Sequence, residues 1–374
     1  MKVAIDSGPL GKGHSIRGVG VHIRELTLAL SEWAKNKKDI EVELMDFSNS
    51  DLSGFNILHY QFFHPFFISL PWQKPKNTKI VLTVHDLIPL IFPKHYPGGI
   101  RGSLRFLIQK FLVKKNVDVL ITISETSKKD ICRFLGVSPE KVHVVYLASR
   151  KVFQRVADSE KRVVKEKYNL PEKFALYVGD VNYNKNIPNL IKACKLAKIP
   201  LVICGKQAFD IETLGVDDLS NLKGPKDWIR YLFGKPHPEL AHFQDLLKEF
   251  NHGKSVIRLG FVPDEDLVAI YNLASVYVQP SLYEGFSLPI LEALACGCPV
   301  VASRIQAHVE IVEGGALFAD PHKPEEIAGQ VTKVIKDGKI KKQLIKSGFT
   351  VVKKFSWEKA AKETINVYRA VINA

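Results

Sequence analysis

Short apolar runs rich in Val, Ile and Leu alternate with longer amphipathic stretches along most of the chain. Ten of these runs predict strands: "KVAID", "NILHY", "KIVLTVHD", "DVLITIS" and "KVHVVYL" in the first half, and "FALYVGD", "PLVICG", "SVIRLGF", "SVYVQPS" and "PVVAS" in the second. Continuous apolar runs separated by helices are typical of parallel sheets that are buried on both faces. Two such series in succession predict two doubly wound, Rossmann-like α/β domains.

Charged and irregular stretches set the predicted boundaries. The stretch from 150 to 172, "RKVFQRVADSEKRVVKEKYNLPE", predicts the crossover between a domain of residues 1–170 and a domain of residues 171–355. The stretch from 207 to 253 predicts a helix, "PELAHFQDLLKEF", and an irregular surface segment. The end of the chain, "SWEKAAKETINVYRAVI", predicts a helix within residues 356–374 that is capped by Ser356 and packs back on the first domain.

The composition fits this organisation. A chain of 374 residues is too long for a single domain with one hydrophobic core. With 46% hydrophobic residues it has enough apolar side chains to form two cores. No run approaches the roughly 18 apolar residues of a membrane span, and the first residues, "MKVAIDSGPLGKG", lack the apolar region of a signal peptide. The five cysteines form no C-x-x-C pair, which is typical of reduced thiols. We therefore expect a cytoplasmic protein.

The positive charge is concentrated in the first domain. The whole chain has a net charge of +14, and residues 1–170 hold 27 Lys and Arg against 16 Asp and Glu, a net charge of +11. Such a field attracts nucleic acid, acidic lipid headgroups or phosphorylated substrates. Because the chain has no zinc finger and no aromatic strand of the RNA-binding type, we expect no nucleic-acid partner.

One segment combines two carboxylates with an apolar helix pattern. "YEGFSLPILEALACGCPVVAS", residues 283–303, holds Glu284 and Glu292 with seven residues between them. A strand, "SVYVQPS", precedes this segment, Pro289 suits the first turn of a helix, and Gly297 suits its end. The loop between strand and helix therefore lies at the carboxyl end of a strand, where doubly wound domains bind ligands.

The start of this helix predicts an anion site. The backbone N–H groups of Phe286, Ser287 and Leu288 lie in or just before the first turn, and such groups bind phosphate without a metal ion. An anion site beside the carboxylates of Glu284 and Glu292 suits a nucleotide sugar. The backbone amides would bind its diphosphate, and the carboxylates would accept hydrogen bonds from its hydroxyls. The alternative is that both glutamates only complement the helix dipole.

This segment resembles the E-x7-E motif of retaining glycosyltransferases of family four, which have the GT-B fold. The resemblance extends over nearly the whole chain, through "VGDVNYNKN", "GFVPDEDLVAIYNLASVYV", "GALFADP" and "FSWEKAA". It implies two Rossmann-like domains that face each other across a cleft. It also implies transfer of a sugar from a nucleotide diphosphate donor, with retention at the anomeric carbon.

The resemblance assigns roles to three residues. It implies that Glu292 holds the donor ribose and that Glu284 contacts the donor sugar near the reaction centre. "TVHDLIPL" places His85 and Asp86 at the carboxyl end of a strand, and the equivalent His of the family contacts the transferred sugar. Asp86 either orients His85 or caps a turn.

The resemblance also implies cations and glycines at the diphosphate. Lys185 in "NYNKN" is expected to reach it as a point charge. The family commonly has an Arg where this chain has Asp180, and Lys206 or Arg304 are candidates to replace that cation. Two further expected donor contacts lie in "RGVGVHIREL", where glycines let the backbone approach a pyrophosphate: Gly18 and Gly20.

We predict no metal ion and no other cofactor. "PDEDL", residues 263–267, has the spacing of a D-x-D metal motif, but it begins an amphipathic run and predicts an acidic helix start. In GT-B chemistry, backbone amides and a lysine stabilise the leaving diphosphate.

A basic helix is predicted in the first domain. "RGSLRFLIQKFLVKKN", residues 101–116, has no acidic residue, and its five cations are Arg101, Arg105, Lys110, Lys114 and Lys115. Leu104, Leu107, Ile108 and Phe111 follow helical spacing. This pattern predicts either a core-facing helix with a solvated basic face or contact with an anionic membrane or lipid-diphosphate acceptor. The apolar segment "FFHPFFISLPW", residues 62–72, is a second candidate for the acceptor side.

Together these features predict a retaining, metal-independent glycosyltransferase that makes cell-surface polysaccharide or glycolipid. The donor expected first is GDP-mannose and the second UDP-glucose, because "HDLIPLIFP" and "EGFSLPILEALACG" look most like mannosyl-transferring relatives. The acceptor is expected to be a glycan or a lipid-linked sugar. The alternatives are another enzyme on the same scaffold, such as an epimerase or a phosphorylase, and a basic scaffold protein without catalysis.

Overall fold

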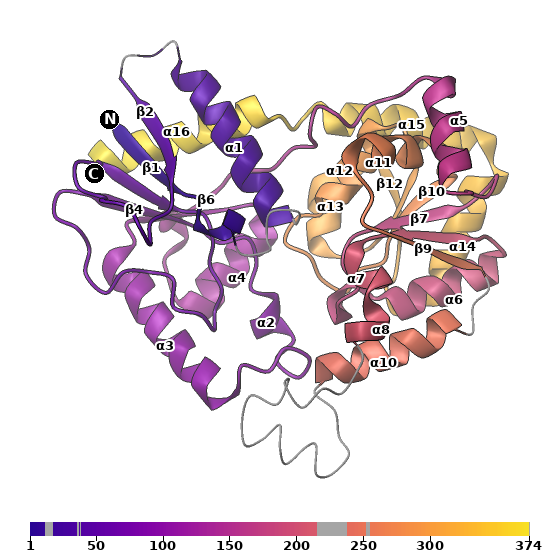
Figure 1. Cartoon of the computed structure of the whole chain (residues 1–374), viewed down its shortest axis with the longest axis horizontal. Helices are drawn as coiled ribbons and strands as arrows, with labels where there is room; N and C mark the ends of the chain where they lie inside the picture. The colour runs from indigo at the N-terminus through magenta and orange to yellow at the C-terminus, as the bar shows by residue number, and fades with distance from the viewer. Residues whose placement is uncertain (12–17, 36, 38, 215–237, 252–254, 374) are drawn as a thin grey trace. The chain divides into compact units, whose positions relative to one another are not determined.

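The computed structural model describes residues 1–11, 18–35, 37, 39–214, 238–251 and 255–373. Internal contacts divide the chain into two compact units (Figure 1). Unit 1 consists of Met1–Pro93, Pro97–Ala148 and Phe355–Ala374, and unit 2 consists of Lys94–Tyr96 and Ser149–Lys354. The structure thus divides the chain at Ala148, whereas the sequence analysis placed the division at residue 170. The reason is that α5 (Asp158–Lys167) packs on α11 (Asp264–Leu273) within unit 2.

Unit 1 contains a sheet of six parallel strands. In sequence order they are β1 (Lys2–Asp6), β2 (Glu41–Met45), β3 (Ile57–Tyr60), β4 (Lys79–Thr83), β5 (Val119–Thr122) and β6 (Val142–Val144). In space their order is β2-β1-β3-β4-β5-β6, a doubly wound topology of the flavodoxin type with one further strand. The sequence pattern missed β2, because its charged residues belong to an edge strand that is partly exposed.

Helices cover both faces of this sheet (Figure 1). On one face α1 (Gly18–Ala34) packs on the closing helix α16 (Trp357–Asn373), while α3 (Gly99–Asn116) and α4 (Glu125–Leu135) lie on the other. The hydroxyl of Ser356 accepts the N–H of Lys359 at 3.1 Å, so the predicted helix cap is present. Three short elements complete the unit: η1 (Gly8–Gly11), α2 (Ile88–Ile91) and η2 (Pro139–Lys141).

Unit 2 contains a second sheet of six parallel strands. They are β7 (Ala175–Val178), β8 (Leu201–Cys204), β9 (Val256–Gly260), β10 (Val276–Gln279), β11 (Val300–Ser303) and β12 (Ala316–Ala319). Their spatial order, β12-β11-β10-β7-β8-β9, is the strand order of a Rossmann fold read from the other edge. The ten predicted strands are therefore confirmed, and β12, a four-residue edge strand, was missed.

Helices follow the strands of unit 2 as a doubly wound sheet requires. They are η3 (Tyr183–Lys185), α6 (Ile187–Ala197), α7 (Lys206–Phe209), α8 (Ile211–Leu214), α10 (Pro238–Asn251), α12 (Leu288–Ala295), α13 (Gln306–Val312), α14 (Pro324–Lys336) and α15 (Gly338–Val352). The predicted helix "PELAHFQDLLKEF" is α10, and most of the irregular segment before it lies outside the described residues. The acidic start of α11 confirms the reading of "PDEDL" as the start of a helix.

Candidate active site

The candidate site of unit 2 lies where the strand order changes direction. Neighbouring strands β7 and β10 pair directly, but the chain continues from β7 to β8 on one side and from β10 to β11 on the other. Their carboxyl-end loops diverge and leave room for a ligand at this switch point. One loop supplies Lys185, and the other supplies Glu284 and the start of α12.

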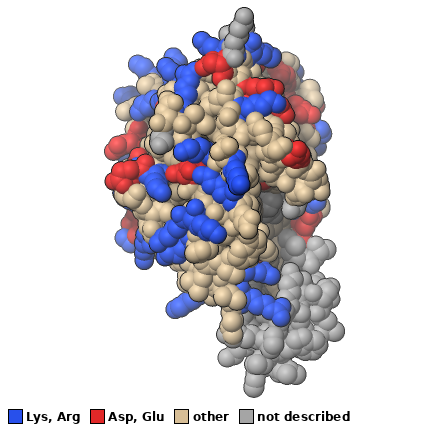
Figure 2. Space-filling model, turned by 90° about the vertical axis from the view of Figure 1, so that its left-hand side faces the viewer, with Lys and Arg blue, Asp and Glu red and all other residues tan. Residues whose placement is uncertain are grey.

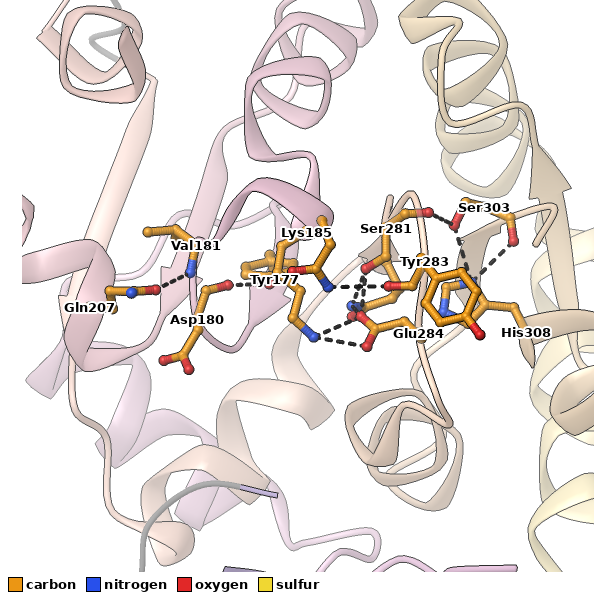
Figure 3. A network of polar contacts seen from close by, with 12 residues as sticks. Tyr177, Asp180, Val181, Lys185, Gln207, Ser281, Tyr283, Glu284, Ser303 and His308 are labelled. Atoms are coloured by element: carbon orange, nitrogen blue, oxygen red, sulfur yellow. Dashed lines mark hydrogen bonds and ion pairs between the residues drawn. The ribbon is translucent and has the colours of Figure 1, made fainter. Parts of the chain in front are cut away.

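Lys185 and Glu284 form an ion pair in this place (Figure 3). The ammonium nitrogen Nζ lies 2.7 Å from Oε1 and 3.0 Å from Oε2 of the carboxylate. The side chain of Glu284 is only 7% exposed, whereas that of Lys185 is 23% exposed. The ammonium therefore keeps access to solvent while it holds the carboxylate in place.

Two neighbouring side chains complete the shell of Glu284. The hydroxyl of Ser281 and the amide of Gln279 donate to Oε1 at 2.7 and 3.1 Å. Burial alone would raise the pKa of Glu284, but the charge of Lys185 and the hydroxyl of Ser281 bring that pKa below its ordinary value. The carboxylate is consequently ionised at neutral pH.

His308 lies deeper behind this carboxylate. Its Nδ1 lies 3.1 Å from the carbonyl oxygen of Ser303, while its buried Nε2 contacts no hydrogen-bond partner among the described residues. Burial lowers the pKa of His308 to about 4, although the nearby charge of Glu284 favours the protonated ring. The imidazole is therefore neutral at physiological pH and adds a polar, uncharged group near Glu284.

Glu292 lies inside α12 in a separate polar cluster. Tyr271 donates its hydroxyl to Oε2 at 3.2 Å, and Nη2 of Arg150 lies 3.4 Å from Oε1. Arg150 also binds Asp264 at the start of α11. Burial raises the pKa of Glu292 to about 7, against the opposing effects of Arg150 and Tyr271.

The two carboxylates belong to one electrostatic environment. Tyr277 of β10 is fully buried, and its hydroxyl contacts Gln279, the residue that donates to Glu284. Burial raises the pKa of Tyr277, and the charges of Glu284 and Glu292 raise it further. The spacing of seven residues thus places both carboxylates around one buried strand end.

The first turn of α12 has the features expected of an anion site. Phe286, Ser287 and Leu288 are buried, and Pro289 occupies the start of the helix as predicted. Ser287 adopts φ of 96°, a conformation that favours glycine, and its buried hydroxyl has no hydrogen-bond partner among the described residues. The first N–H groups of any helix have no partner within it, so this turn offers donors to a ligand.

The other proposed cations lie apart from this network. Lys206 is exposed at the start of α7, and Arg304 is exposed with its guanidinium 5.5 Å from the ring centre of Phe318. Asp180 accepts the hydroxyl of Tyr177 through its backbone carbonyl at 2.6 Å, and its carboxylate points away from Glu284 in Figure 3. In unit 2, Lys185 is the predicted cation that the structure brings to the carboxylates.

The candidate residues of unit 1 gather near the carboxyl end of β4. Nε2 of His85 lies 2.7 Å from Nδ1 of the buried His22 on α1. Burial lowers the pKa of both rings, so both are neutral at physiological pH. Asp86 accepts the N–H of Ile88 at 3.1 Å, which is the turn-capping role.

Gly18 and Gly20 were expected in the loop after the first strand. The structure places them in the first turn of α1, which begins at Gly18. Gly18 is exposed and Gly20 is buried. The preceding residues 12–17 lie outside the described part of the chain.

Neither a metal cluster nor a membrane-spanning helix occurs in the described part of the chain. Those residues contain no group of three or more His, Cys, Asp and Glu side chains that could hold a metal ion. No helix among them is long and apolar enough to cross a bilayer.

Comparison with known proteins shows the family of this chain. The sequence model "Glycosyl transferases group 1" matches residues 158–351, and "Glycosyltransferase Family 4" matches residues 43–148. The first match covers more than half of the chain. The chain therefore belongs to the group 1 glycosyltransferases, and the predicted family is confirmed.

Individual relatives support the family and the fold. O-antigen chain mannosyltransferase B of Escherichia coli is 29% identical over 78% of this chain and 70% of its own length. Sucrose-phosphate synthase from Thermosynechococcus elongatus is 21% identical, with a TM-score of 0.71 over 100% of this chain and 99% of that one. Anabaena HepE in complex with UDP and glucose is 15% identical, with a TM-score of 0.67 over 99% and 100%. These structures and the two doubly wound sheets confirm the GT-B fold.

Several polar residues of the site were missed at the sequence level. Gln279 and Ser281 follow an apolar strand, and a polar residue at such a strand end is a usable signal. Arg150, Tyr271 and His308 carry no comparable signal. Arg150 and Tyr271 contact Glu292, and His308 lies near enough to Glu284 for their charges to interact, so only the folded structure brings these residues to the carboxylates.

Proposed function

We propose that this glycosyltransferase transfers a hexose, with mannose as first choice, from a nucleotide diphosphate donor and retains the anomeric configuration. The observation that carries this proposal is the ion pair of Lys185 and Glu284 beside the first turn of α12. A cation, backbone N–H donors and an ionised carboxylate thus lie together at the switch point of a Rossmann sheet. A nucleotide sugar can use the first two for its diphosphate and the third for its sugar.

Each group has a defined task in the proposed reaction. The amides of the first α12 turn and the ammonium of Lys185 bind the diphosphate. An ammonium has three donors, so Lys185 can serve the diphosphate without leaving Glu284. Glu284 faces the positive charge that develops on the sugar, and Glu292 accepts hydrogen bonds from the ribose.

The atoms balance without a further reactant. The bond between the anomeric carbon and the phosphate oxygen breaks, and the acceptor oxygen forms its bond on the same face. The acceptor proton passes to the departing phosphate oxygen. His85 is proposed to contact the transferred sugar as a neutral hydrogen-bonding group. Backbone amides and Lys185 supply the stabilisation of the leaving group, so no metal ion is required.

The name of the Escherichia coli relative supports mannose as donor sugar and a surface polysaccharide as product. The acceptor is then a growing glycan or a lipid-linked sugar. The Anabaena structure contains UDP and glucose, which supports UDP-glucose as second donor. The basic surface of unit 1 supports work at the cytoplasmic face of a membrane.

Mass spectrometry of nucleotide sugars incubated with the protein tests the function. We expect slow hydrolysis of GDP-mannose without acceptor, unaffected by EDTA. Glu284→Gln should reduce turnover at least 100-fold, about 3 kcal/mol of transition-state stabilisation, with little change in nucleotide affinity. Glu310→Gln, on α13, is the control and should retain turnover. Loss of activity in EDTA that manganese restores would contradict metal independence, and no turnover of any nucleotide sugar would contradict the function.

A further inference from the structure

Helix α3 of unit 1 presents an apolar stripe to solvent. Four side chains are exposed by 77%, 59%, 62% and 57%: Ile100, Leu104, Leu107 and Phe111. Their spacing places them within about 60° of one another around the helix axis. The core-facing alternative for Leu104, Leu107 and Phe111 is therefore wrong.

The opposite side of α3 accounts for the packing. Its buried residues are Gly102, Gln109, Leu112, Val113 and Asn116. The segment 62–72 packs against that side through two hydrogen bonds. The side-chain amide of Gln109 donates to the carbonyl of Phe67 at 2.6 Å, and the side-chain amide of Asn116 donates to the carbonyl of Pro71 at 2.6 Å. The helix is thus held by Leu112 and Val113 in the hydrophobic core and by the hydrogen bonds of Gln109 and Asn116, and the apolar stripe contributes little to the core.

Cations flank the stripe on both sides. At about 100° per residue, Lys110 and Lys114 flank one edge, Lys115 and Arg101 flank the other, and Arg105 lies farther round the helix. The helix has no acidic residue. On the face of the molecule in Figure 2, which is the left-hand side of Figure 1 where α3 lies, Lys and Arg side chains stand beside a broad uncharged area.

This arrangement matches the chemistry of an anionic bilayer. Exposed Leu, Ile and Phe enter the boundary of the acyl chains, while flanking cations contact acidic headgroups. Exposed apolar patches of this kind mark an interaction site, and the flanking cations favour an anionic lipid surface as its partner. Trp72, 58% exposed in the attached segment, adds an indole of the kind that is enriched at membrane interfaces.

We propose that α3 docks unit 1 onto the surface of an anionic lipid bilayer, with the stripe of Ile100, Leu104, Leu107 and Phe111 inserted and the four flanking cations at the headgroups. The proposal deepens the proposed function, since it names the surface on which the enzyme would reach a lipid-linked acceptor. Vesicle binding requires neither donor nor acceptor. A protein that does not bind vesicles but still turns over a nucleotide sugar would therefore contradict this proposal and leave the proposed function intact.

Co-sedimentation of the full chain with vesicles of phosphatidylcholine and phosphatidylglycerol tests the proposal. We expect binding that needs phosphatidylglycerol and falls as salt rises, because the Debye length shrinks to about 3 Å at 1 M. Replacing Arg101, Lys110 and Lys115 with Gln should lower the partition coefficient about 100-fold, since each cation contributes about 1 kcal/mol or fivefold. Replacing Leu104 and Leu107 with Ser should lower it about 100-fold as well, roughly tenfold for each side chain.

Matched controls on unit 2 separate the surface from net charge and general hydrophobicity. Lys333, Lys336 and Lys342 are exposed, and their replacement with Gln removes the same charge. Leu196 and Phe261 are 56% and 59% exposed, and their replacement with Ser removes similar apolar area. Both controls should bind within twofold of the parent. Circular dichroism melting should show that all variants remain folded.

Three results would overturn the proposal. The parent could ignore anionic vesicles at low salt, or the unit 2 controls could lose as much binding as the α3 variants. Alternatively, light scattering could show a parental dimer that Leu104→Ser with Leu107→Ser converts to monomers without any vesicle binding by the parent. That result would identify a second copy of the chain as the occupant of the stripe.

Discussion

At the scale of single residues, burial and pairing give the two glutamates different protonation behaviour. Lys185 holds the pKa of Glu284 below its ordinary value, whereas burial raises the pKa of Glu292 to about 7. The pKa values of the two carboxylates shift in opposite directions because their partners differ. Glu284 pairs with the ammonium of Lys185, whereas Glu292 contacts the phenol of Tyr271 and the guanidinium of Arg150, which also binds Asp264. The first is suited to permanent charge, and the second titrates near neutral pH.

Glu292 predicts a pH dependence of stability. A carboxyl whose pKa is raised on folding favours the folded state below its ordinary pKa of 4.5, and this contribution disappears as pH rises to about 7. The melting temperature of the parent should therefore fall relative to that of Glu292→Gln between about pH 5 and pH 8. Differential scanning calorimetry over this range measures the difference.

The exposed Glu265 on α11 provides the control. Glu265→Gln should follow the parent at every pH. Parallel curves for the parent and Glu292→Gln would show that Glu292 does not titrate in this range. Nucleotide affinity of Glu292→Gln should also be lower at pH 8, because the ribose loses a charged acceptor worth about 1.5 to 3 kcal/mol.

At the scale of elements, the start of α12 contains local strain. Ser287 has φ of 96° and buries a hydroxyl without a partner among the described residues. Left-handed backbone costs an L-residue about 1–2 kcal/mol, and glycine avoids this cost. Strain of this kind is tolerated where the surrounding structure fixes the backbone, which is common at ligand sites.

Ser287→Gly is expected to raise the free energy of unfolding by about 1 kcal/mol. Urea denaturation followed by circular dichroism measures the change. Ser281→Gly is the matched control, because it removes a hydroxyl that donates to Glu284. That variant should lose stability, and a loss of similar size in Ser287→Gly would mean that the serine hydroxyl has a stabilising contact.

At the scale of the whole molecule, the chain leaves unit 1 after Ala148 and returns to it at Phe355. The returning helix α16 buries Tyr368 completely, and the phenol hydroxyl lies 2.6 Å from Nδ1 of His59 on β3. Burial lowers the pKa of His59 to about 3, so the ring stays neutral and hydrogen-bonded inside the sheet. Unit 1 is therefore incomplete until the last residues of the chain are in place.

Tyr368→Ala is expected to destabilise unit 1 by about 3–5 kcal/mol, the usual cost of removing a buried aromatic ring. Hydrogen exchange followed by mass spectrometry should show faster exchange in β1 to β6 and unchanged protection in β7 to β12. Arg369→Ala, one residue along, removes an exposed ion pair with Asp39 and a contact with the ring of Trp33, and it should destabilise unit 1 far less. Equal loss of protection in both sheets would contradict the division into two units.

Much of this organisation could be predicted from the sequence. The predicted apolar runs became strands, since a parallel strand buried on both faces leaves a continuous Val, Ile and Leu pattern. Glu284 and the start of α12 were expected at the site because loops after strands hold ligands in such sheets, whereas the role of Lys185 was implied by the family resemblance. The missed strands β2 and β12 are short edge strands, and an edge strand is only partly buried, so its pattern is weak.

The sequence by itself determined the fold class and the candidate carboxylates, because these depend on local periodicity and on residues close together in the chain, and its motifs carried the family resemblance. Only the tertiary structure decided which groups surround each carboxylate and which side of α3 is buried. Arg150 reaches Glu292 across 142 positions of the chain, and the apolar stripe of α3 became visible only once Gln109 and Asn116 were found on the buried side. Long-range contacts of this kind depend on the packing of whole elements, and a periodic pattern cannot distinguish an apolar face that enters the core from one that is exposed.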